Sequence, residues 1–376
     1  MNSQGIAVVG AHHTPIRREV TDQSLEEMVF DAARGALVDA GHTIEDIDSV
    51  ILSSSDQVEG RVIESMVTNG AAGGVGRDVT TLASAGEHAF IYAYLRLRAG
   101  HARRALVVVW SKESESVDPA HPDLLGAEPF MLRPLGMTSL AAAGLQASAY
   151  AHRYGLDAEA VRRVREVRGR AASRAYGVPG DNPGDPSSAQ PSAWPLTKAD
   201  LPRGCDVACA VVMTAAEAVT PEHAPAWVSG VGWVTERYDL GERDLSRFAA
   251  LEAAARMALG GDGSARHVDA VEVQEISSVA SFAACEALGL APQGEGSRAA
   301  TASTPAVNPS GGNLFVNPGN AAGVLRFIAA AQQVRGRAGA AQVSPRPRTA
   351  VGAALHGFAG QGAAVVSFTA DEDEVA

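Results

Sequence analysis

His356 opens a glycine-rich loop that runs to Gly362, where a titratable side chain could move protons. An imidazole with an ordinary pKa of about 6.5 can accept or donate a proton near neutrality. The alternative is a loop histidine whose nitrogens are satisfied by backbone groups. Cys205 and Cys209 are separated by three residues with no histidine ligand nearby, and Cys285 stands apart. The sequence therefore predicts neither a metal site nor a disulfide framework.

A run of six arginines falls within one predicted helix of an acidic chain. Guanidinium groups bind phosphates in a fork geometry, so the run predicts a site for phosphate groups or for an acidic partner protein. The alternative is a solvated helix face on which Arg162 pairs with Glu166 four residues later. The arginines are Arg162, Arg163, Arg165, Arg168, Arg170 and Arg174.

The elements that position these residues occur twice, as a strand, a helix and a second strand. In the first half, Ser24 and Glu27 form a predicted capping box, and Gly41 ends the helix. The three elements lie at residues 6–10, 25–40 and 47–52, and again at 227–232, 246–259 and 268–273. This order predicts an internal duplication. Chance similarity between two common βα units is the alternative.

Both halves continue alike, with a helix and a buried strand followed by a closing strand. These elements lie at residues 86–98, 105–110 and 208–213 in the first half and at 320–334, 349–355 and 363–368 in the second. An insertion at residues 111–203 carries two helices, at 140–154 and 158–176. We expect an α/β protein whose duplicated βαβ halves, residues 1–222 and 223–376, form a five-layer α/β/α/β/α sandwich with a helical insertion.

Composition narrows the classes of function. Of the 376 residues, 46% are apolar and 20% are charged, so a sizeable core is expected. A net charge of −12 argues against a general nucleic-acid binder, because phosphate contacts need clustered cations. No apolar run approaches the roughly 20 residues of a membrane span. The few cysteines and the lack of a signal-peptide pattern at the N-terminus favour the cytoplasm.

Three segments carry a resemblance to a known family. They are Asn308-Pro-Ser-Gly-Gly312, the pair Val271-Glu-Val-Gln-Glu275 and Glu286-Ala-Leu-Gly-Leu290, and Ser84-Ala-Gly-Glu-His-Ala89. With these segments the chain resembles the thiolase superfamily, especially thiolases of the sterol-carrier-protein-x type. The resemblance covers nearly the whole chain and implies the thiolase fold, with a coenzyme A or acyl-carrier thioester as substrate and no bound cofactor or metal.

The resemblance also places the catalytic positions, and the expected groups are missing from them. Thiolases carry a nucleophilic cysteine where a helix begins, because the helix dipole favours the thiolate. The matching position here is Ala83, which cannot carry an acyl group. The neighbouring Ser84 has a hydroxyl, but one step round the helix start points its side chain elsewhere. His88, one turn into the helix, is expected to pack or to cap.

Other positions retain hydrogen-bond donors. Asn317 stands where the family has a histidine, and Gln274 occupies the family's polar position after the acidic strand. Both can donate to a thioester oxygen without titrating. His356 stands near the family's acid/base cysteine. The backbone N–H groups of Ala83 and Gly360 are expected to help bind an oxyanion.

The asparagine-proline-serine-glycine-glycine loop completes the predicted site. By the resemblance, Asn308 and Ser310 are expected to bind substrate, and Gly311 and Gly312 to let the backbone approach a ligand or a neighbouring strand. A purely structural turn is the alternative for the glycines.

Three functions remain open. The loss of three chemical groups together favours a non-catalytic thiolase-like subunit, the partner of a working thiolase in a hetero-oligomeric acyltransferase or C–C bond-forming complex. A thiolase-fold aldolase or C–C lyase that uses His356 as acid/base is the second. Relatives of that kind work with a zinc-ribbon/OB-fold partner and use tyrosines in the C-terminal half, whereas the last tyrosine here is Tyr238. A non-catalytic thioester-binding protein is the third. Pairing with a second thiolase-like chain is expected through the strand around residues 78–82.

Overall fold

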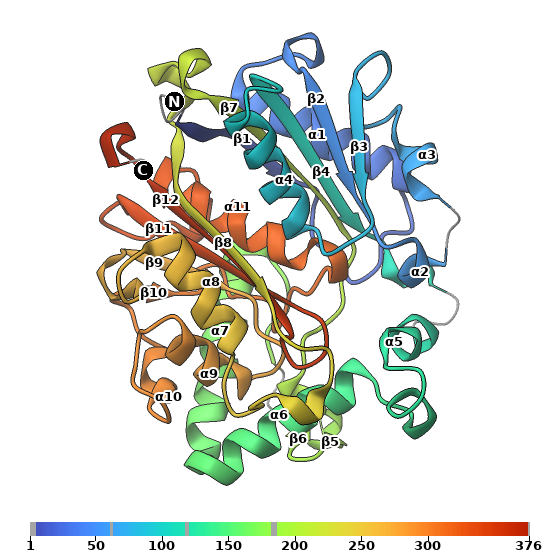
Figure 1. Cartoon of the computed structure of the whole chain (residues 1–376), viewed down its shortest axis with the longest axis vertical. Coiled ribbons are helices and arrows are strands. Elements are labelled where there is room, and N and C mark those ends of the chain that lie inside the picture. Colours follow the sequence, from blue (N-terminus) through green and yellow to red (C-terminus); the bar gives the residue numbers. More distant parts are fainter. Residues whose placement is uncertain (1–4, 61–62, 117–119, 182–185, 375–376) are drawn as a thin grey trace.

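The computed structural model describes residues 5–60, 63–116, 120–181 and 186–374, whose main strands join into one ten-stranded arrangement (Figure 1). The first five strands in spatial order are β1 (Ile6–His13), β7 (Val207–Ala215), β4 (Arg104–Ser111), β2 (Ser49–Ser53) and β3 (Asp78–Leu82). The other five, in matching order, are β8 (Ala226–Thr235), β12 (Gly362–Thr369), β11 (Thr349–His356), β9 (Ala270–Val273) and β10 (Ala306–Val307).

The two sets of strands repeat one topology. In each set the strands lie in the chain order first, fifth, fourth, second and third. The second strand is parallel to the third and fourth, and the fifth is antiparallel to both of its neighbours. A short antiparallel contact of β1 with β8 joins the sets, with Ala7 opposite Trp227 and Val8 opposite Ala226. This repeated order agrees with the expected duplication.

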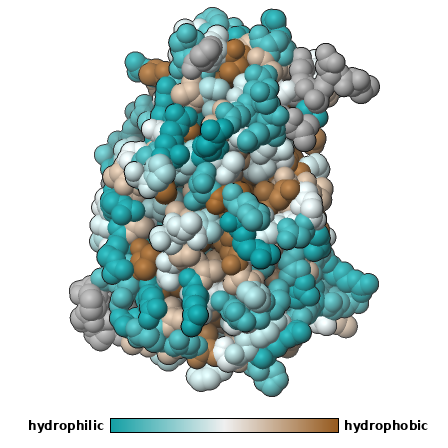
Figure 2. All heavy atoms as spheres, turned by 90° about the vertical axis from the view of Figure 1, so that its left-hand side faces the viewer, coloured by the Kyte–Doolittle hydropathy of each residue, from teal (hydrophilic) through white to brown (hydrophobic). Residues whose placement is uncertain are grey.

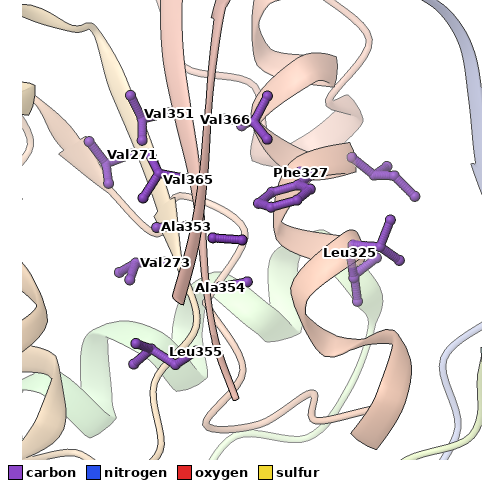
Figure 3. Close-up of a cluster of buried hydrophobic side chains, with 14 of the residues drawn as sticks. Val271, Val273, Leu325, Phe327, Val351, Ala353, Ala354, Leu355, Val365 and Val366 are labelled. Atoms are coloured by element: carbon purple, nitrogen blue, oxygen red, sulfur yellow. The ribbon is translucent and has the colours of Figure 1, made fainter. Parts of the chain in front are cut away.

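Helices form three layers around the two sets of strands. Helix α1 (Leu25–Ala40) packs on β1, β7 and β4, whereas α8 (Ala249–Leu259) packs on β8 and β12. Helices α4 (Glu87–Arg98) and α11 (Ala322–Arg335) contact each other between the sets. Figure 3 shows apolar side chains on both faces of the strands β9, β11 and β12, with Leu325 and Phe327 of α11 packed against one of these faces. The predicted five-layer sandwich is confirmed.

Local signals in the sequence explain why α1 forms where it does. The Ser24 side chain accepts from the Glu27 N–H and the Glu27 side chain accepts from the Ser24 N–H, so the predicted capping box is present. Gly41 ends the helix in a left-handed conformation, with a φ of 67° that glycine adopts without steric cost.

The insertion folds as helices and a small hairpin, which lie in the lower part of the view in Figure 1. Its two expected helices are α6 (Ser139–Tyr154) and α7 (Ala158–Tyr176), and each begins within one residue of the prediction. The spacing of apolar residues did not predict the short helix and the two short strands of the insertion, α5 (Ala120–Gly126), β5 (Pro191–Ala193) and β6 (Leu196–Thr197). The remaining short elements of the chain are α2 (Asp56–Glu59), α3 (Glu64–Thr68), α9 (Ala280–Ala287) and α10 (Gly296–Ala299).

The two sheet edges differ in exposure. Strand β3 pairs only with β2 and lies at the edge of the first set, beside α3. Met66 on α3 is 74% exposed and Val75 before β3 is 72% exposed. Figure 2 shows the opposite side, where β9 and β10 lie, as largely hydrophilic with small and separate apolar spots. An open strand edge flanked by exposed apolar side chains is a surface that soluble proteins usually cover.

Two buried ion pairs join β9 and the residue pair after it to the insertion and to helix α11. Arg168 on α7 donates to Glu275 at 2.8 Å, and both side chains are fully buried. Arg326 on α11 donates in the same way to Glu272 on β9 at 3.1 Å. Removing one member of such a pair leaves a charge in a dry environment, so these contacts hold the layers in register.

Replacing Arg168 by methionine is therefore expected to lower the free energy of unfolding by about 3–5 kcal/mol, because Glu275 would remain buried without its cation. Denaturant titration followed by circular dichroism measures the change. Arg162→Met on the same helix is the matched control, since Arg162 pairs with Glu159 and Glu166 at the surface. This change should leave the free energy of unfolding nearly unchanged, because an exposed ion pair contributes little to stability. Equal effects of the two variants would contradict the role given to Arg168.

Candidate active site

His356, Gln274 and Asn317 converge on one cavity of about 490 Å³. His356 ends β11 and Gln274 directly follows β9, and these strands are parallel neighbours, so their carboxyl ends meet at one edge. The start of α4 and the loop at residues 313–320 complete the polar side of the cavity. The apolar side includes Leu140, Ala143, Leu201, Pro202 and Ile276, most of them from the insertion.

A carboxylate holds the His356 ring. Nδ1 of His356 lies 2.9 Å from Oε1 of Glu87, which is 2% exposed in the first turn of α4. Because an ionised carboxylate only accepts hydrogen bonds, Nδ1 carries the proton and Nε2 is the basic nitrogen of the neutral ring. The ring lies over Gly362, where a Cβ would come within 1.8 Å of Nε2. The pair has the form of a carboxylate-oriented general base.

Glu87 is a candidate site residue that the sequence alone did not indicate. It lies within the segment that carries the family resemblance, but an acidic residue in the first turn of a helix also has an ordinary explanation in the helix dipole. Its pairing with a histidine 269 positions later in the chain could be found only from the fold.

Two side-chain amides that line the cavity have their oxygens bonded to other groups of the chain. Oε1 of Gln274 accepts from the Leu355 N–H at 3.2 Å, and Oδ1 of Asn317 accepts from Nδ2 of Asn313 at 3.2 Å. Both amide oxygens are therefore occupied. Nδ2 of Asn317 and Nε2 of Gln274 remain as donors at the cavity wall, a suitable pair for a carbonyl oxygen that gains negative charge.

The expected backbone donors lie elsewhere. The Gly360 N–H donates to the Gly357 carbonyl at 3.3 Å inside its own loop, and a role of this N–H in binding an oxyanion stays a prediction. Ala83 is exposed beyond β3 and is not among the described residues that line the cavity, whereas Ala85 is. The position matched to the nucleophile therefore opens toward the β3 edge and not into this cavity.

The asparagine-proline-serine-glycine-glycine loop is held by hydrogen bonds within the second half, and its assignment to substrate binding stays a prediction. Asn308 bonds both the N–H and the carbonyl of Val273. Ser310 donates to Glu272 at 2.6 Å. Gly311 and Gly312 have φ of 100° and 62°, and a Cβ on either would come within about 2.5 Å of a neighbouring atom. The loop's polar groups are thus occupied by β9, and none of these four residues lines the cavity.

The other side chains at the start of α4 form a chain of contacts toward the surface. Oγ of the exposed Ser84 lies 2.9 Å from Nδ1 of His88. The rings of His88 and His356 meet edge to face with centroids 4.7 Å apart. Burial lowers the pKa of His88, so this ring is neutral at pH 7. Ser84 itself is not among the described residues that line the cavity.

The six arginines do not form one cluster. Arg162 lies in an exposed ion pair with Glu166, as the alternative interpretation expected, and Arg168 is buried. Arg170 and Arg174 line a separate open groove along α7, and phosphate binding there stays a prediction.

Two other kinds of site are absent from the described part of the chain. Residues 5–60, 63–116, 120–181 and 186–374 contain no group of three or more histidine, cysteine or acidic side chains arranged to hold a metal ion. Within the same ranges no helix combines the length and the apolar character that crossing a bilayer needs.

The three cysteines are buried, and none of them lines the cavity. Burial raises the pKa of Cys205, and it raises the pKa of Cys209 and of Cys285 to about 12. At pH 8 we therefore expect all three thiols to be protonated and unreactive in the folded protein. Ellman's reagent should titrate none in the native state and all of them in guanidinium chloride. Intact-mass analysis after incubation with acetyl-CoA should show no acyl adduct. Rapid release of one thiolate equivalent from the native chain would contradict this expectation.

Comparisons with known proteins agree with the fold. Residues 232–368 match the family described as thiolase C-terminal domain-like. An acetyl-CoA acetyltransferase from Methanothermobacter thermautotrophicus is 26% identical over 365 residues, which cover 90% of this chain and 93% of that protein. A β-ketoacyl-[acyl-carrier-protein] synthase III from Synechococcus sp. is 35% identical over 106 residues, which is 27% of this chain and only 32% of the synthase.

Two solved structures extend the likeness over the whole chain. The structure of an Ltp2-ChsH2(DUF35) aldolase matches with a TM-score of 0.78 at 16% identity, covering 98% of each chain. A monomeric SCP2-thiolase-like protein, type 1, from Mycobacterium smegmatis matches with a TM-score of 0.75 at 18% identity, covering 99% of this chain and 79% of the other. With the repeated strand order and the five layers, these matches show that the chain has the thiolase fold and is similar to SCP2-thiolase-like proteins.

Proposed function

We propose that the chain is the catalytic subunit of a C–C lyase that binds an acyl-CoA or acyl-carrier thioester in the cavity and works without an acyl-enzyme. The observation that carries the proposal is the pairing of His356 with Glu87 in the same cavity as the amide nitrogens of Asn317 and Gln274. These groups supply one base and two oxyanion donors, which suffice for an aldol-type reaction and not for acyl transfer through a thiolate.

The proposed reaction is the cleavage of a β-hydroxyacyl thioester. Nε2 of His356 takes the proton of the β-hydroxyl, the Cα–Cβ bond breaks, and a ketone or aldehyde forms at Cβ. The electron pair of the broken bond moves into a thioester enolate, whose oxygen accepts hydrogen bonds from Asn317 and Gln274. The imidazolium then returns its proton to Cα and yields a shortened acyl thioester. The reverse sequence joins the two fragments.

The comparisons support the proposal of a C–C lyase through one structural match. The structure of an aldolase matches over 98% of the chain. The described cavity offers no tyrosine, and no tyrosine follows Tyr238 in the sequence, so proton transfer falls to His356. The apolar wall from the insertion favours a substrate whose acyl group is apolar.

A second candidate function is that of a non-catalytic subunit beside a working thiolase. Ala83 and Ser84 are exposed at the end of β3, which supports a role in shaping a neighbour's pocket. A purely thioester-binding role would need only the two amide donors. The carboxylate that holds His356 favours the enzyme over both alternatives, because binding alone does not require an oriented base.

Partners follow from the open strand edge and from the comparisons. A second thiolase-fold subunit, either a copy of this chain or a related chain, is proposed to pair with β3. The matched aldolase includes a DUF35 component beside its thiolase-like chain, and a component of that kind is proposed as an additional partner.

His356→Gln is expected to reduce turnover of a β-hydroxyacyl-CoA by the assembled complex at least about 10²-fold, because glutamine cannot accept the proton. This corresponds to about 2.7 kcal/mol of barrier. Coupled detection of the released carbonyl compound measures the rate, and light scattering checks assembly. His267→Gln, at an exposed position, is the matched control and should leave the rate unchanged.

The rates of the complex after His356→Gln and after replacement of a partner's cysteine distinguish the candidate functions. If the rate survives His356→Gln but disappears when a partner's cysteine is replaced, the non-catalytic subunit is correct and the lyase proposal fails. If neither change affects the rate, the cavity described here is not the site of the reaction.

The open β3 edge is expected to produce a dimer or a larger assembly, because its unpaired backbone groups and the exposed Met66 and Val75 favour association. Thr81→Lys on β3 should weaken it by placing like charges at the paired edges, whereas Val38→Lys on α1 serves as the control. Light scattering at micromolar concentration reports the mass. A monomer, the state of the matched mycobacterial protein, would overturn the expectation unless a related subunit restores assembly.

A further inference from the structure

Asn313 occupies a buried position between the peptide backbone and the proposed oxyanion donor Asn317. Its side chain is 1% exposed. Oδ1 of Asn313 accepts from the Glu275 N–H, and Nδ2 of Asn313 donates to Oδ1 of Asn317 at 3.2 Å. One side chain thus connects a fixed backbone donor to a side chain at the cavity wall.

The direction of these hydrogen bonds follows from chemistry. A backbone N–H can only donate, so the group of Asn313 that meets Glu275 must be its carbonyl oxygen. The amide nitrogen of Asn313 then points the other way and must donate, which requires an oxygen from Asn317. The Asn317 amide is planar, so its own nitrogen is turned away from Asn313, and Asn317 lines the cavity.

The main chain of Asn317 cannot compensate for a loss of this contact. Its N–H donates to the Arg203 carbonyl at 2.9 Å, and its carbonyl accepts from the Cys205 N–H at 3.3 Å. The backbone is therefore held in place while the side-chain amide could still rotate by half a turn. No described contact other than that with Asn313 selects which end of this amide meets the cavity.

Gln274 provides an internal comparison. Its amide oxygen accepts directly from the Leu355 N–H, so its orientation needs no intermediate side chain. A change at Asn313 should therefore alter the polarity of one donor of the pair and leave the other intact.

From these contacts we infer that Asn313 is a positioning residue that turns the NH₂ group of Asn317 toward the thioester carbonyl. The inference rests on the proposed function for its ligand, since a thioester is the expected acceptor. The orientation of the Asn317 amide itself is a property of the chain and is testable without any ligand.

The deciding variant is Asn313→Asp. A carboxylate accepts at both oxygens, so one would keep the Glu275 N–H and the other would attract the NH₂ group of Asn317. The Asn317 amide would then rotate and present its oxygen to the cavity. Asn313→Ala removes the hydrogen bond that fixes the orientation of the Asn317 amide but does not reverse this orientation, so it is the milder variant. Thermal melts followed by circular dichroism establish that each variant folds.

The first measurement observes the amide directly. Protein labelled with ¹⁵N only at asparagine gives side-chain NH₂ signals, and Asn317→Asp identifies the signal of Asn317. In the wild type these protons are expected to exchange rapidly with water, and in Asn313→Asp they should be protected by the new hydrogen bond. Equal exchange in wild type and in a folded variant would overturn the inference. If Asn313→Asp does not fold, an Asn317 signal in Asn313→Ala with wild-type position and exchange would overturn it equally.

The second measurement tests the consequence for binding. A ketone analogue of an acyl-CoA, with methylene in place of sulfur, is compared with the S-alkyl-CoA thioether of equal length by calorimetry. The wild type should prefer the ketone, and the share of Asn317 in this preference should be about 2- to 10-fold, the usual range for one neutral hydrogen bond. Asn313→Asp should lower the preference by at least this factor while Gln274 still donates, and Asn313→Ala should lower it by less. An unchanged preference in either folded variant contradicts the inference. If wild type binds neither ligand, the proposed function fails, and the amide exchange alone decides the role of Asn313.

Discussion

The segment from Glu272 to Glu275 is the constraint on which the rest of the structure depends. Three polar side chains of this segment have partners in different parts of the molecule. Glu272 binds Arg326 of the central helix, Gln274 reaches the cavity, and the side chain of Glu275 binds Arg168 of the insertion. Buried carboxylates are stable only when paired, so Glu272 and Glu275 are held in place by their arginines. The same contacts therefore position Gln274, which lies between them and lines the cavity. Stability and site geometry are therefore coupled at one short strand and the turn that follows it.

Much of the fold could be predicted from local patterns, because capping residues and apolar periodicity act over a few positions. The Ser24 box, the Gly41 stop and the long helices of the insertion follow from such signals. The short helix α5 and the β5–β6 hairpin did not, since they are held by tertiary contacts such as the bond from Ser148 to the Trp194 carbonyl. The duplication could be predicted from the sequence because the same order of strands and helices occurs in both halves.

The site was only partly predictable, for a physical reason that differs from residue to residue. His356, Gln274 and Asn317 were placed by resemblance to the family, and the structure brings them to one cavity. The loop from Asn308 to Gly312 was assigned to substrate, yet its polar groups are occupied by β9. Which face of a loop meets a strand is a long-range property that sequence spacing does not contain. Glu87 and Asn313 were missed for the same reason, because each acts through a partner distant in the chain or in the fold.

The start of α4 shows how a thiolase scaffold can support other chemistry. A helix N-terminus stabilises an anion through its dipole and its free N–H groups. In thiolases the resemblance places a thiolate there, whereas here Ala83 is inert and the anion in the first turn is the carboxylate of Glu87. This charge is directed at an imidazole, not at a substrate carbonyl. In the proposed function, the same local field orients a base in place of a nucleophile. With the amides of Asn317 and Gln274 as the other polar groups assigned to the proposed reaction, such a site would move a proton and hold an enolate without the covalent step of a thiolase.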